Sequence, residues 1–428
     1  MNALKITNFI TIKHAQLEIK DLNILIGPQA SGKSVIAKLL YFFKKFVNET
    51  IPKSARESIK KAELIKEAIS EFTKIFPKYS WENQEFHIEY MKGDVHIKIS
   101  QVSKPGSKTK LSFHCSENLN AVTAKISKAI KKKQKIFEEE SKANSKHKAP
   151  FELQFEFSKI TRDIMRQELG VNSLEDPTFI PAGRSFFANL QKNVFSFLAG
   201  NIEIDPFLKE FGSAYEHAKN MLIHREGIAR SEKILIGEID ALIQSILRGK
   251  FQQDKSGDWI QTDHCRINVA NSSSGQQEAL PMLIILSLLP LFSRPDEKNV
   301  FFIEEPEAHL FPEAQHKVIK LLINIYNKTK RNNNFFITTH SPYVLSVLNS
   351  CMLAADVIRK SNDENIVLKY KNASIDFENV SAYSVENGIV KNILNSKERL
   401  IDVNVIDSAS EDINKEFEDL LSLQYGNS

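Results

Sequence analysis

The sequence predicts an α/β protein whose core is a mostly parallel sheet with helices on both faces, interrupted by a large inserted region of helices and antiparallel strands. The first observation is a strand, a glycine-containing loop and a helix near the N-terminus, with the apolar run 22–26 as the strand and 35–46 as the helix. The second is the alternation of helices and strands in the last third of the chain, which is typical of a parallel sheet. In chain order these expected elements are helix 276–292, strand 299–303, helix 312–326, strand 334–338, helix 343–348 and strand 352–358.

The other elements are predicted from the spacing of apolar residues, since alternation indicates a strand and helical spacing indicates a helix. The first 26 residues are expected to hold two or three strands. Residues 81–115 are expected to hold antiparallel strands with turns at 92–94 and 104–106. The rest comprises a helix at 53–76, an exposed helix and a linker within 117–149, a strand at 151–157, a helix at 158–169, a strand at 179–184, mostly helix over 190–249 with a break near Asp205-Pro206, and a strand segment at 258–270.

Composition and charge are those of an ordinary globular protein. Hydrophobic residues make up 42% of the 428 residues and charged residues 26%, which argues against wholesale disorder. The net charge of +4 is mildly basic and does not by itself indicate a nucleic-acid binder. Cys115, Cys265 and Cys351 are far apart without a C-x-x-C spacing, so we expect no disulfide framework, no zinc site and a reducing, cytoplasmic location. No signal peptide is expected at the start, and the longest apolar stretch, 279–292, is too short to span a membrane.

The phosphate loop, defined as residues 27–34, matches the pattern G-x-x-x-x-G-K-[ST] at every fixed position and lies between a strand and a helix, as the pattern requires. Its glycines let successive backbone N–H groups point at a β-phosphate, and the helix N-terminus adds its positive end. The lysine can reach the β- and γ-phosphates, and the serine after it can bind Mg²⁺. The candidate nucleotide-binding residues in this loop are Gly27, Pro28, Gln29, Ala30, Ser31, Gly32, Lys33 and Ser34.

Two adjacent acids, Glu304 and Glu305, follow the apolar run 300–303. Acids at the carboxyl edge of such a sheet lie where α/β proteins bind ligands. Because neighbouring side chains on a strand point in opposite directions, the two carboxylates can take different roles. We expect Glu304 to hold the hydration shell of Mg²⁺ and Glu305 to accept a proton from an attacking water. A solvated strand end is the plain alternative.

Two further segments fit a phosphate site, although each also has an ordinary structural explanation. Ser273, Ser274, Gly275 and Gln276, which we call the signature turn, precede a buried helix. A hydroxyl and bare N–H groups at a helix N-terminus can bind an anion, but a simple serine cap has the same sequence. His340 follows the strand 334–338 and can donate a hydrogen bond to a γ-phosphate oxygen, or it can be a structural histidine.

The order of phosphate loop, Ser-Gly-Gln turn, double acid and histidine is similar to that of ABC-type ATPases, in which the turn is the signature motif. The segments Glu304-Glu-Pro-Glu-Ala-His-Leu-Phe-Pro312 and Thr339-His-Ser-Pro342 resemble, more narrowly, the overcoming-lysogenization-defect (OLD) type ATPases. Relatives of that family belong to bacterial anti-phage systems such as Septu, PARIS and some retrons. The resemblance covers residues 1–46 and 255–400.

The chain departs from the family pattern at several positions. The usual Gly-Gly of the signature is Ser-Gly at 274–275, and the usual Asp of the Mg²⁺ strand is Glu304. The glutamine loop has two candidates, Gln101 and Gln191. Arg184 resembles a strand-end arginine of the family, for which contact with the nucleotide is one option.

The resemblance implies an ATPase that uses ATP and Mg²⁺, with Glu305 and His340 as catalytic residues and Ser34 and Glu304 as metal-binding residues. It also implies that the signature turn of one subunit binds the γ-phosphate of ATP held by the phosphate loop of another. The expected assembly is therefore a head-to-tail homodimer, or a higher oligomer of such dimers, with ATP at the joint.

Four parts are expected along the chain, because the span from Lys33 to Ser273 is longer than a nucleotide-binding core requires. Residues 1–47 form the N-terminal part of the core, and 48–178 form an inserted helical and β region that serves as a sensor or partner surface. Residues 179–254 form a helical lobe. Residues 255–428 complete the core with the signature turn, the double acid of the Walker B strand, the histidine loop and a closing tail.

The expected function is an ATP-driven switch subunit that controls a separate effector, a nuclease, because no Asp-x-Asp motif for a nuclease site of its own follows His340. The alternative is a RecF- or SMC-like DNA-repair ATPase that acts on DNA ends or gaps. The lysine-rich stretch 125–148 could contact DNA phosphates, although a solvated helix is the simpler interpretation. A transporter ATPase, which would need a membrane partner, and a scaffold that binds ATP without turnover are the remaining alternatives.

Overall fold

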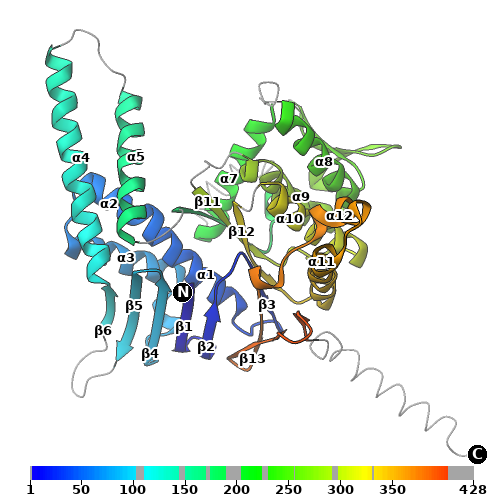
Figure 1. Ribbon diagram of the computed structural model, residues 1–428, viewed down its shortest axis with the longest axis horizontal. Helices are drawn as coiled ribbons and strands as arrows, with labels where there is room; N and C mark the ends of the chain where they lie inside the picture. Colours follow the sequence, from blue (N-terminus) through cyan, green and yellow to red (C-terminus); the bar gives the residue numbers. More distant parts are fainter. Residues whose placement is uncertain are drawn as a thin grey trace, which may run out of the picture.

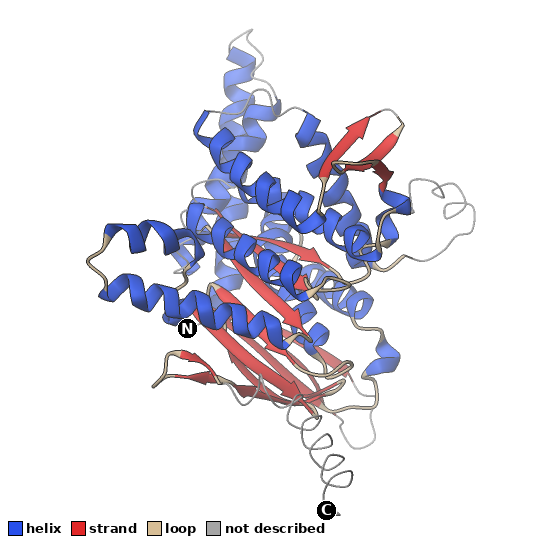
Figure 2. Cartoon of the chain, turned by 90° about the vertical axis from the view of Figure 1, so that its right-hand side faces the viewer, coloured by secondary structure: helices blue, strands red, loops and turns tan. Residues whose placement is uncertain are grey.

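The computed structural model describes residues 2–102, 110–143, 150–169, 174–188, 204–223, 230–254, 256–291, 297–329 and 332–402. Within these ranges the main feature is one mixed sheet of eleven strands with helices packed on both of its faces (Figure 1 and Figure 2). In spatial order the strands are β6 (Lys110–Cys115), β5 (Val95–Val102), β4 (Phe86–Lys92), β1 (Asn2–Phe9), β2 (Ile12–Glu18), β14 (Ile389–Asn392), β13 (Val380–Glu386), β3 (Leu22–Ile26), β12 (Asn333–Thr339), β11 (Glu297–Glu304) and β7 (Leu174–Ile180).

The strands from β13 to β7 run parallel to one another and form the half of the sheet that carries the predicted site. They are buried on both faces, as near-continuous apolar strands require. Neighbouring residues alternate between two hydrophobic cores, so that Phe302 packs in one core and Phe301 in the other. Because the strands are parallel, the ends of β3, β11 and β12 meet at one edge of the sheet, where α/β proteins bind ligands.

The other half of the sheet is mostly antiparallel. β1 pairs with β2 on one side and with β4 on the other, and β5 and β6 follow outward. The antiparallel strands predicted within 81–115 therefore continue the main sheet from β1. The predicted turn at 92–94 joins β4 to β5, whereas the one at 104–106 lies outside the described residues.

Helices cover both faces of the sheet. The first core contains apolar residues of α1 (Lys33–Lys45), the π-helix η1 (Phe46–Thr50), α2 (Ile51–Glu57), α3 (Lys61–Ile75), α4 (Glu117–Ala143) and α5 (Pro150–Leu169). The second core contains residues of α7 (Pro206–Ile223), α8 (Arg230–Leu247), α9 (Ser274–Leu288), α10 (Pro312–Lys328) and α11 (Pro342–Lys360).

Several smaller elements complete the described part of the chain. A three-stranded sheet is formed by β8 (Lys250–Asp254), β9 (Gly257–Gln261) and β10 (Arg266–Asn268), and a strand pair by β15 (Leu394–Asn395) and β16 (Leu400–Ile401). The others are helix α12 (Glu364–Tyr370) and the short 3₁₀ turns η2 (Lys78–Ser80), η4 (Val269–Asn271), η5 (Leu289–Leu291), η6 (Lys371–Ala373) and η7 (Phe377–Asn379).

The strand predicted at 151–157 is wrong, because this segment belongs to the helix α5. Its alternation of apolar and polar residues fitted a strand, but the residues that follow settle the conformation. Phe157, Ile160 and Ile164 lie at helical spacing and pack against the first core. Helices α4 and α5 form a hairpin that projects from the body of the molecule (Figure 1).

The strand predicted at 352–358 is also wrong, because α11 continues without a break to Lys360. Cys351, Met352 and Ala355 are buried, while Leu353 and Val357 are exposed. This spacing is helical, so the apolar residues lie on two sides of one helix. Among the described residues, we find no helix with the length and apolar character that crossing a membrane requires.

Candidate functional site

The phosphate loop connects the end of β3 to the start of α1, as predicted. Gly32 has a φ of +105°, and a Cβ atom there would lie 2.4 Å from Cδ1 of Ile12. Only glycine suits both conditions, since positive φ disfavours other residues and the space beside it is filled. Ala30 also has a positive φ, of 57°. The backbone is thus wound tightly just before the N-terminus of α1, where an anion is stabilised.

Lys33 is buried at the start of α1, and its ammonium group contacts the first residues of the phosphate loop. Nζ donates hydrogen bonds to the carbonyl oxygens of Gly27 and Pro28, each at 2.7 Å. It also lies 3.4 Å from Nδ1 of His340. Burial lowers the pKa of Lys33, although the carboxylates of Glu305 and its neighbours oppose this shift. The lysine therefore sits in the loop where the β- and γ-phosphates of a nucleotide are expected.

Glu304 ends β11 with a side chain that is 7% exposed. Its Oε2 accepts a hydrogen bond from the backbone N–H of Ala182 at 3.2 Å. Its Oε1 is buried and has no hydrogen-bond partner among the described residues. A buried carboxylate oxygen without a partner is costly unless a cation or water reaches it, so this residue fits the predicted binding of Mg²⁺.

Ser34, the other predicted Mg²⁺ residue, is exposed at the N-terminal end of α1. Within the described part of the chain, no group of three or more His, Cys, Asp or Glu side chains could hold a metal ion. A nucleotide-bound Mg²⁺ usually takes one or two protein oxygens, water and the phosphates of its nucleotide. The residues present therefore fit a nucleotide-bound magnesium ion.

Glu305 follows the last residue of β11 and contacts a different partner from Glu304. Its Oε1 lies 3.0 Å from Nε2 of His340, and both side chains are partly exposed. Its backbone has a φ of 45°, which marks a sharp turn immediately after the strand. Lys33, His340 and Glu305 thus form a continuous chain of polar contacts across the ends of β11 and β12.

Glu307 is a functional residue whose role the sequence reasoning missed. Its Oε1 accepts hydrogen bonds from Oγ1 of Thr339 at 2.5 Å and from the backbone N–H of His340 at 2.8 Å. The carboxylate thereby fixes the histidine loop at the end of β12. The signal was present in the acid-rich segment that begins at Glu304, but spacing alone did not say which strand end the third acid contacts.

Arg184 is fully buried and holds the end of β11 in place. Its guanidinium donates to the carbonyl oxygens of Glu304 at 2.7 Å, Pro181 at 2.8 Å and Glu305 at 2.9 Å. Its Nε donates to the carbonyl oxygen of Glu278 in α9 at 3.0 Å. Burial lowers the pKa of Arg184, although nearby carboxylates oppose the shift. Arg184 is therefore a positioning residue that links the double acid to α9.

The signature turn begins α9 and is held as a capping box. Oγ of Ser273 accepts from the backbone N–H of Gln276, while Oε1 of Gln276 accepts from the N–H of Ser273. A Cβ atom on Gly275 would lie 2.6 Å from the carbonyl oxygen of His309, so the turn packs directly on the loop that follows Glu305. Ser273 is therefore the N-cap of α9, as the plain explanation has it, and it is also exposed to solvent.

The structure brings together the phosphate loop, the double acid and His340, whereas the signature turn lines a cavity with other residues. That cavity, of about 490 Å³, is lined by Ser273, Gly275 and Gln276 and by residues from the end of α8 and the start of α10. Neither the phosphate loop nor Glu305 nor His340 lines it.

The candidates for the glutamine loop have different outcomes. Gln101 is buried in β5 and donates to the backbone carbonyls of Trp81, Glu82 and Gln84, so it holds a local turn. Its strand lies far along the sheet from β3. Gln101 is therefore not a site residue, and Gln191 lies outside the described residues.

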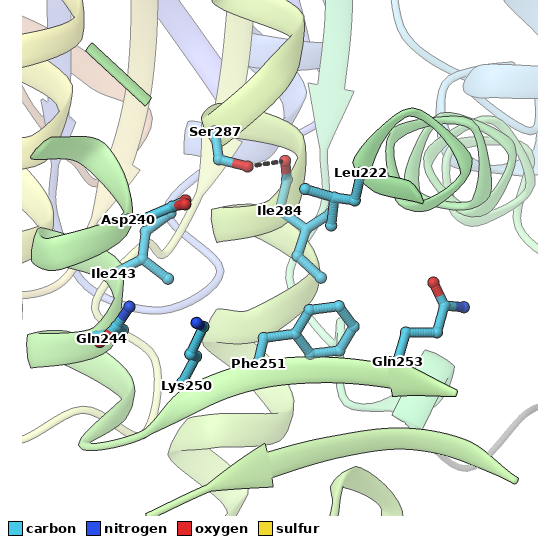
Figure 3. A pocket seen from close by; sticks show the side chains of 9 residues that line it. All are labelled: Leu222, Asp240, Ile243, Gln244, Lys250, Phe251, Gln253, Ile284 and Ser287. Carbon is cyan, nitrogen blue, oxygen red and sulfur yellow. Dashed lines mark hydrogen bonds between the residues drawn. The ribbon is translucent and has the colours of Figure 1, made fainter. Parts of the chain in front are cut away.

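A separate cavity of about 350 Å³ lies between α7, α8, α9 and β8. Figure 3 shows the side chains of Lys250, Phe251 and Gln244 around it, with Ile284 of α9 opposite Phe251. Its lining is mainly apolar, and it includes none of the predicted site residues. This cavity is therefore distinct from both the phosphate loop and the signature turn.

Comparison with solved structures finds proteins of low sequence identity. The SMC head domain from Thermotoga maritima is 10% identical over 91% of this chain and 97% of that chain, with a TM-score of 0.35. The Smc head domain with an extended coiled coil bound to the C-terminal domain of ScpA, from Pyrococcus furiosus, is 11% identical over 96% and 98%, with a TM-score of 0.36. The recombination mediator protein RecF with ATP is 12% identical over 91% and 97%, with a TM-score of 0.33.

Comparison with sequences gives the family. No curated protein matches the chain. The model of the family described as AAA ATPase domain matches residues 1–345, which is most of the chain and includes the phosphate loop, the signature turn, the double acid and His340. The predicted fold class, an α/β P-loop ATPase core with inserted helices and antiparallel strands, is confirmed. The chain belongs to the AAA ATPase domain family and is an ATPase.

Proposed function

We propose that this chain is the ATP-hydrolysing switch subunit of a bacterial anti-phage defence module, in which two copies pair head to tail around ATP and control a separate effector, a nuclease. The observation that carries the proposal is the separation of two half-sites. Lys33, His340 and Glu305 form one half, and the signature turn forms the other in a cavity of its own. Two copies are needed to bring the two halves together around one nucleotide.

In this proposal the chain's own residues have defined roles. The backbone N–H groups of the phosphate loop and Lys33 bind the phosphates, and Ser34 and Glu304 hold Mg²⁺, which supplies charge neutralisation when it is bound. Glu305 accepts the proton of the attacking water. His340 orients the Glu305 carboxylate through the 3.0 Å contact and is itself fixed by Glu307.

The switch follows from where the ATP lies in the pair. ATP that touches both subunits stabilises the paired state, and hydrolysis removes the contacts between the γ-phosphate and the signature turn. The change in the population of pairs is then the output, since a ligand shifts an equilibrium only through its different affinities for the two states. The effector would bind the surface formed by residues 48–178 and respond to the change in the population of pairs.

The second candidate function, a RecF- or SMC-like ATPase that acts on DNA, is favoured by one feature of α4. This helix carries an exposed lysine series that includes Lys128, Lys131 and Lys132. Lys125 and Lys133 in the same helix form ion pairs with glutamates of α5, so part of the series holds the hairpin together. The remaining lysines could bind DNA phosphates.

Two measurements test the proposal. Cells carrying this chain with its neighbouring genes, and matched cells carrying Lys33→Ala or Glu305→Gln, are challenged with phages and the plaques are counted. Protection by the wild type alone is expected. Equal plaque numbers in all strains for every phage would refute the defence role. Hydrolysis of ATP is then measured with and without duplex and gapped DNA, and strong stimulation by DNA would favour the second candidate.

A further inference from the structure

The cavity that contains the signature turn also contains an arginine for which the proposed site has no role. Arg248 follows the last residue of α8 and has a φ of 51°, so the chain turns sharply there. Its side chain is 79% exposed and lines the cavity with Ser273, Gly275 and Gln276. A cation is thus placed beside the very turn that is proposed to meet a partner's ATP.

Arg248 is held close to the signature turn through its own backbone neighbours. Nε2 of Gln276 donates to the carbonyl oxygen of Leu247 at 2.8 Å. The N–H of Gly249 is bonded to the carbonyl oxygen of Gln244 in α8 at 3.2 Å. The backbone on both sides of Arg248 is therefore hydrogen-bonded, to the signature turn on one side and to α8 on the other.

The guanidinium of Arg248 has little to hold it within its own subunit. Its Nη2 lies 3.7 Å from a carboxylate oxygen of Glu313, which is beyond hydrogen-bond distance. That carboxylate already accepts a hydrogen bond from Lys317 at 2.7 Å, one helical turn along α10. Lys317 thus holds that carboxylate by a hydrogen bond, whereas Arg248 makes only a longer ion pair with it and keeps its N–H donors for another ligand. A guanidinium has five such donors in a planar fork that matches phosphate oxygens.

We propose that Arg248 of one subunit binds the triphosphate of the ATP held by the phosphate loop of a second copy, and so completes the site in trans. This rests on the proposed function, because it needs the ATP-bridged pair. The occupant of the cavity is a second copy of this chain, and the argument is charge complementarity. The exposed cation and the positive N-terminal end of α9 on one subunit match the polyanionic ligand of the other.

The chain supplies a matched control two residues further on. Lys250 is also an exposed cation, but it lines the separate cavity between α7, α8, α9 and β8, where Figure 3 shows it beside Phe251. Arg248 and Lys250 therefore differ in the cavity they face more than in charge or position along the chain. A general effect of positive charge on this surface would appear in both variants.

The first test compares Arg248→Ala, Arg248→Lys and Lys250→Ala with the wild type. ATP hydrolysis at saturating ATP and the ATP-dependent dimer fraction, by light scattering, are measured together. Arg248→Ala is expected to lower hydrolysis by about 10²-fold and to reduce the dimer fraction, which is the usual size of effect for a lost transition-state donor. Arg248→Lys should recover part of both, and Lys250→Ala should match the wild type. Wild-type values for Arg248→Ala would overturn the proposal.

The second test shows whether Arg248 acts across the joint. Lys33→Ala subunits, which are expected to be inactive alone, are mixed with Arg248→Ala subunits, which alone are expected to keep about 1% of the wild-type rate. A mixed pair has one intact site, formed by Lys33 of one subunit and Arg248 of the other. Random pairing then restores up to about a quarter of the wild-type rate. If Arg248 acted within its own subunit, no mixed pair would have an intact site and mixing would restore nothing.

Failure of this inference can be told apart from failure of the proposed pair. Ser273→Arg fills the turn with a bulky cation and should abolish the ATP-dependent dimer while each subunit still binds ATP. If Ser273→Arg abolishes the dimer but Arg248→Ala keeps wild-type dimerisation and hydrolysis, the pair is correct and the role of Arg248 is wrong. If Ser273→Arg also keeps the ATP-dependent dimer, the head-to-tail pair itself is wrong.

Discussion

Nε2 of His340 lies 3.0 Å from Oε1 of Glu305 at the open edge of the sheet. A carboxylate can only accept a hydrogen bond, so Nε2 carries the proton. Nδ1 then accepts from Lys33, whose Nζ lies 3.4 Å away. The histidine is thereby held in one tautomer between Lys33 of the phosphate loop and the proposed base, and the first two predictions concern Glu305 and Lys33.

Glu305→Gln should release phosphate about 10²- to 10⁴-fold more slowly than the wild type, because an amide cannot accept the proton of the attacking water. ATP binding should remain, since the phosphate loop is untouched. The variant should therefore accumulate ATP-bound pairs. Phosphate release and nucleotide binding are measured on the same preparation. Equal rates of release from both proteins would remove Glu305 from catalysis and favour a scaffold that binds ATP without turnover.

Lys33→Ala should abolish ATP binding and leave the fold intact. The lost ammonium group contacts two loop carbonyls and His340, while the apolar side chains of α1 that pack the core remain. Lys38→Ala, on the same helix, is the matched control and should bind ATP normally. Binding of a fluorescent ATP analogue and circular dichroism are the measurements. Full affinity in Lys33→Ala would contradict the assignment of the phosphate loop.

Arg184→Met should destabilise the protein strongly, although its side chain touches neither the phosphate loop nor the signature turn. The change leaves the carboxylate of Glu278 buried without its cation and several carbonyls without donors. Breaking a buried ion pair in this way lowers the free energy of unfolding by about 3–5 kcal/mol. Arg56→Met, at an exposed position of α2, should change it by no more than about 0.5 kcal/mol. Denaturant unfolding compares the two, and equal stabilities would contradict the positioning role.

Acid should destabilise the protein through Glu175, which is buried at the start of β7. Burial alone would raise its pKa, but the ammonium groups of Lys44 at 2.7 Å and Lys92 at 2.9 Å outweigh burial and lower the pKa to about 2. The unfolded state, with a pKa near 4.5, therefore binds more protons between these values. The stabilisation is complete above pH 4.5 and is lost as the pH falls toward 2, by about 3 kcal/mol in all.

Glu175→Gln supplies the control for this pH dependence. It cannot titrate, so its free energy of unfolding should fall less steeply between pH 4.5 and the lowest pH at which the protein can be measured. The variant should also be less stable at neutral pH, because Lys44 would remain buried without its partner. Parallel slopes for the two proteins over this interval would show that Glu175 is not the titrating group.

Much of the fold could be predicted from the sequence where one periodicity dominates. The strands β3, β11 and β12 are apolar runs next to recognisable loops, and the helices α1 and α10 have regular apolar faces, so their approximate positions were predictable. The segment 151–157 was mispredicted, because its four alternating apolar residues have the period of a strand. The contacts of Ile160 and Ile164 with the core decide for the helix, and those contacts are not visible in a local window.

The residues of the predicted site could be recognised in the sequence, whereas the residues that hold them in position could not. The phosphate loop and the double acid have spacings that chemistry requires, so they could be recognised one motif at a time. The roles of Glu307 and Arg184 depend on which strand ends and helices lie side by side, which only the sheet order provides. Arg248 had no sequence signal at all, because it lies after a helix outside every motif.

The carboxylate of Glu278 in α9 accepts hydrogen bonds from the backbone N–H groups of Arg184 and Ser185. The guanidinium of Arg184 in turn donates hydrogen bonds to the backbone carbonyl oxygens of both residues of the double acid. In the proposed pair, the double acid and the start of α9, which belong to the two half-sites of one subunit, are therefore linked by hydrogen bonds within that subunit. Binding of ATP is then expected to change how two subunits associate more than how each one is folded.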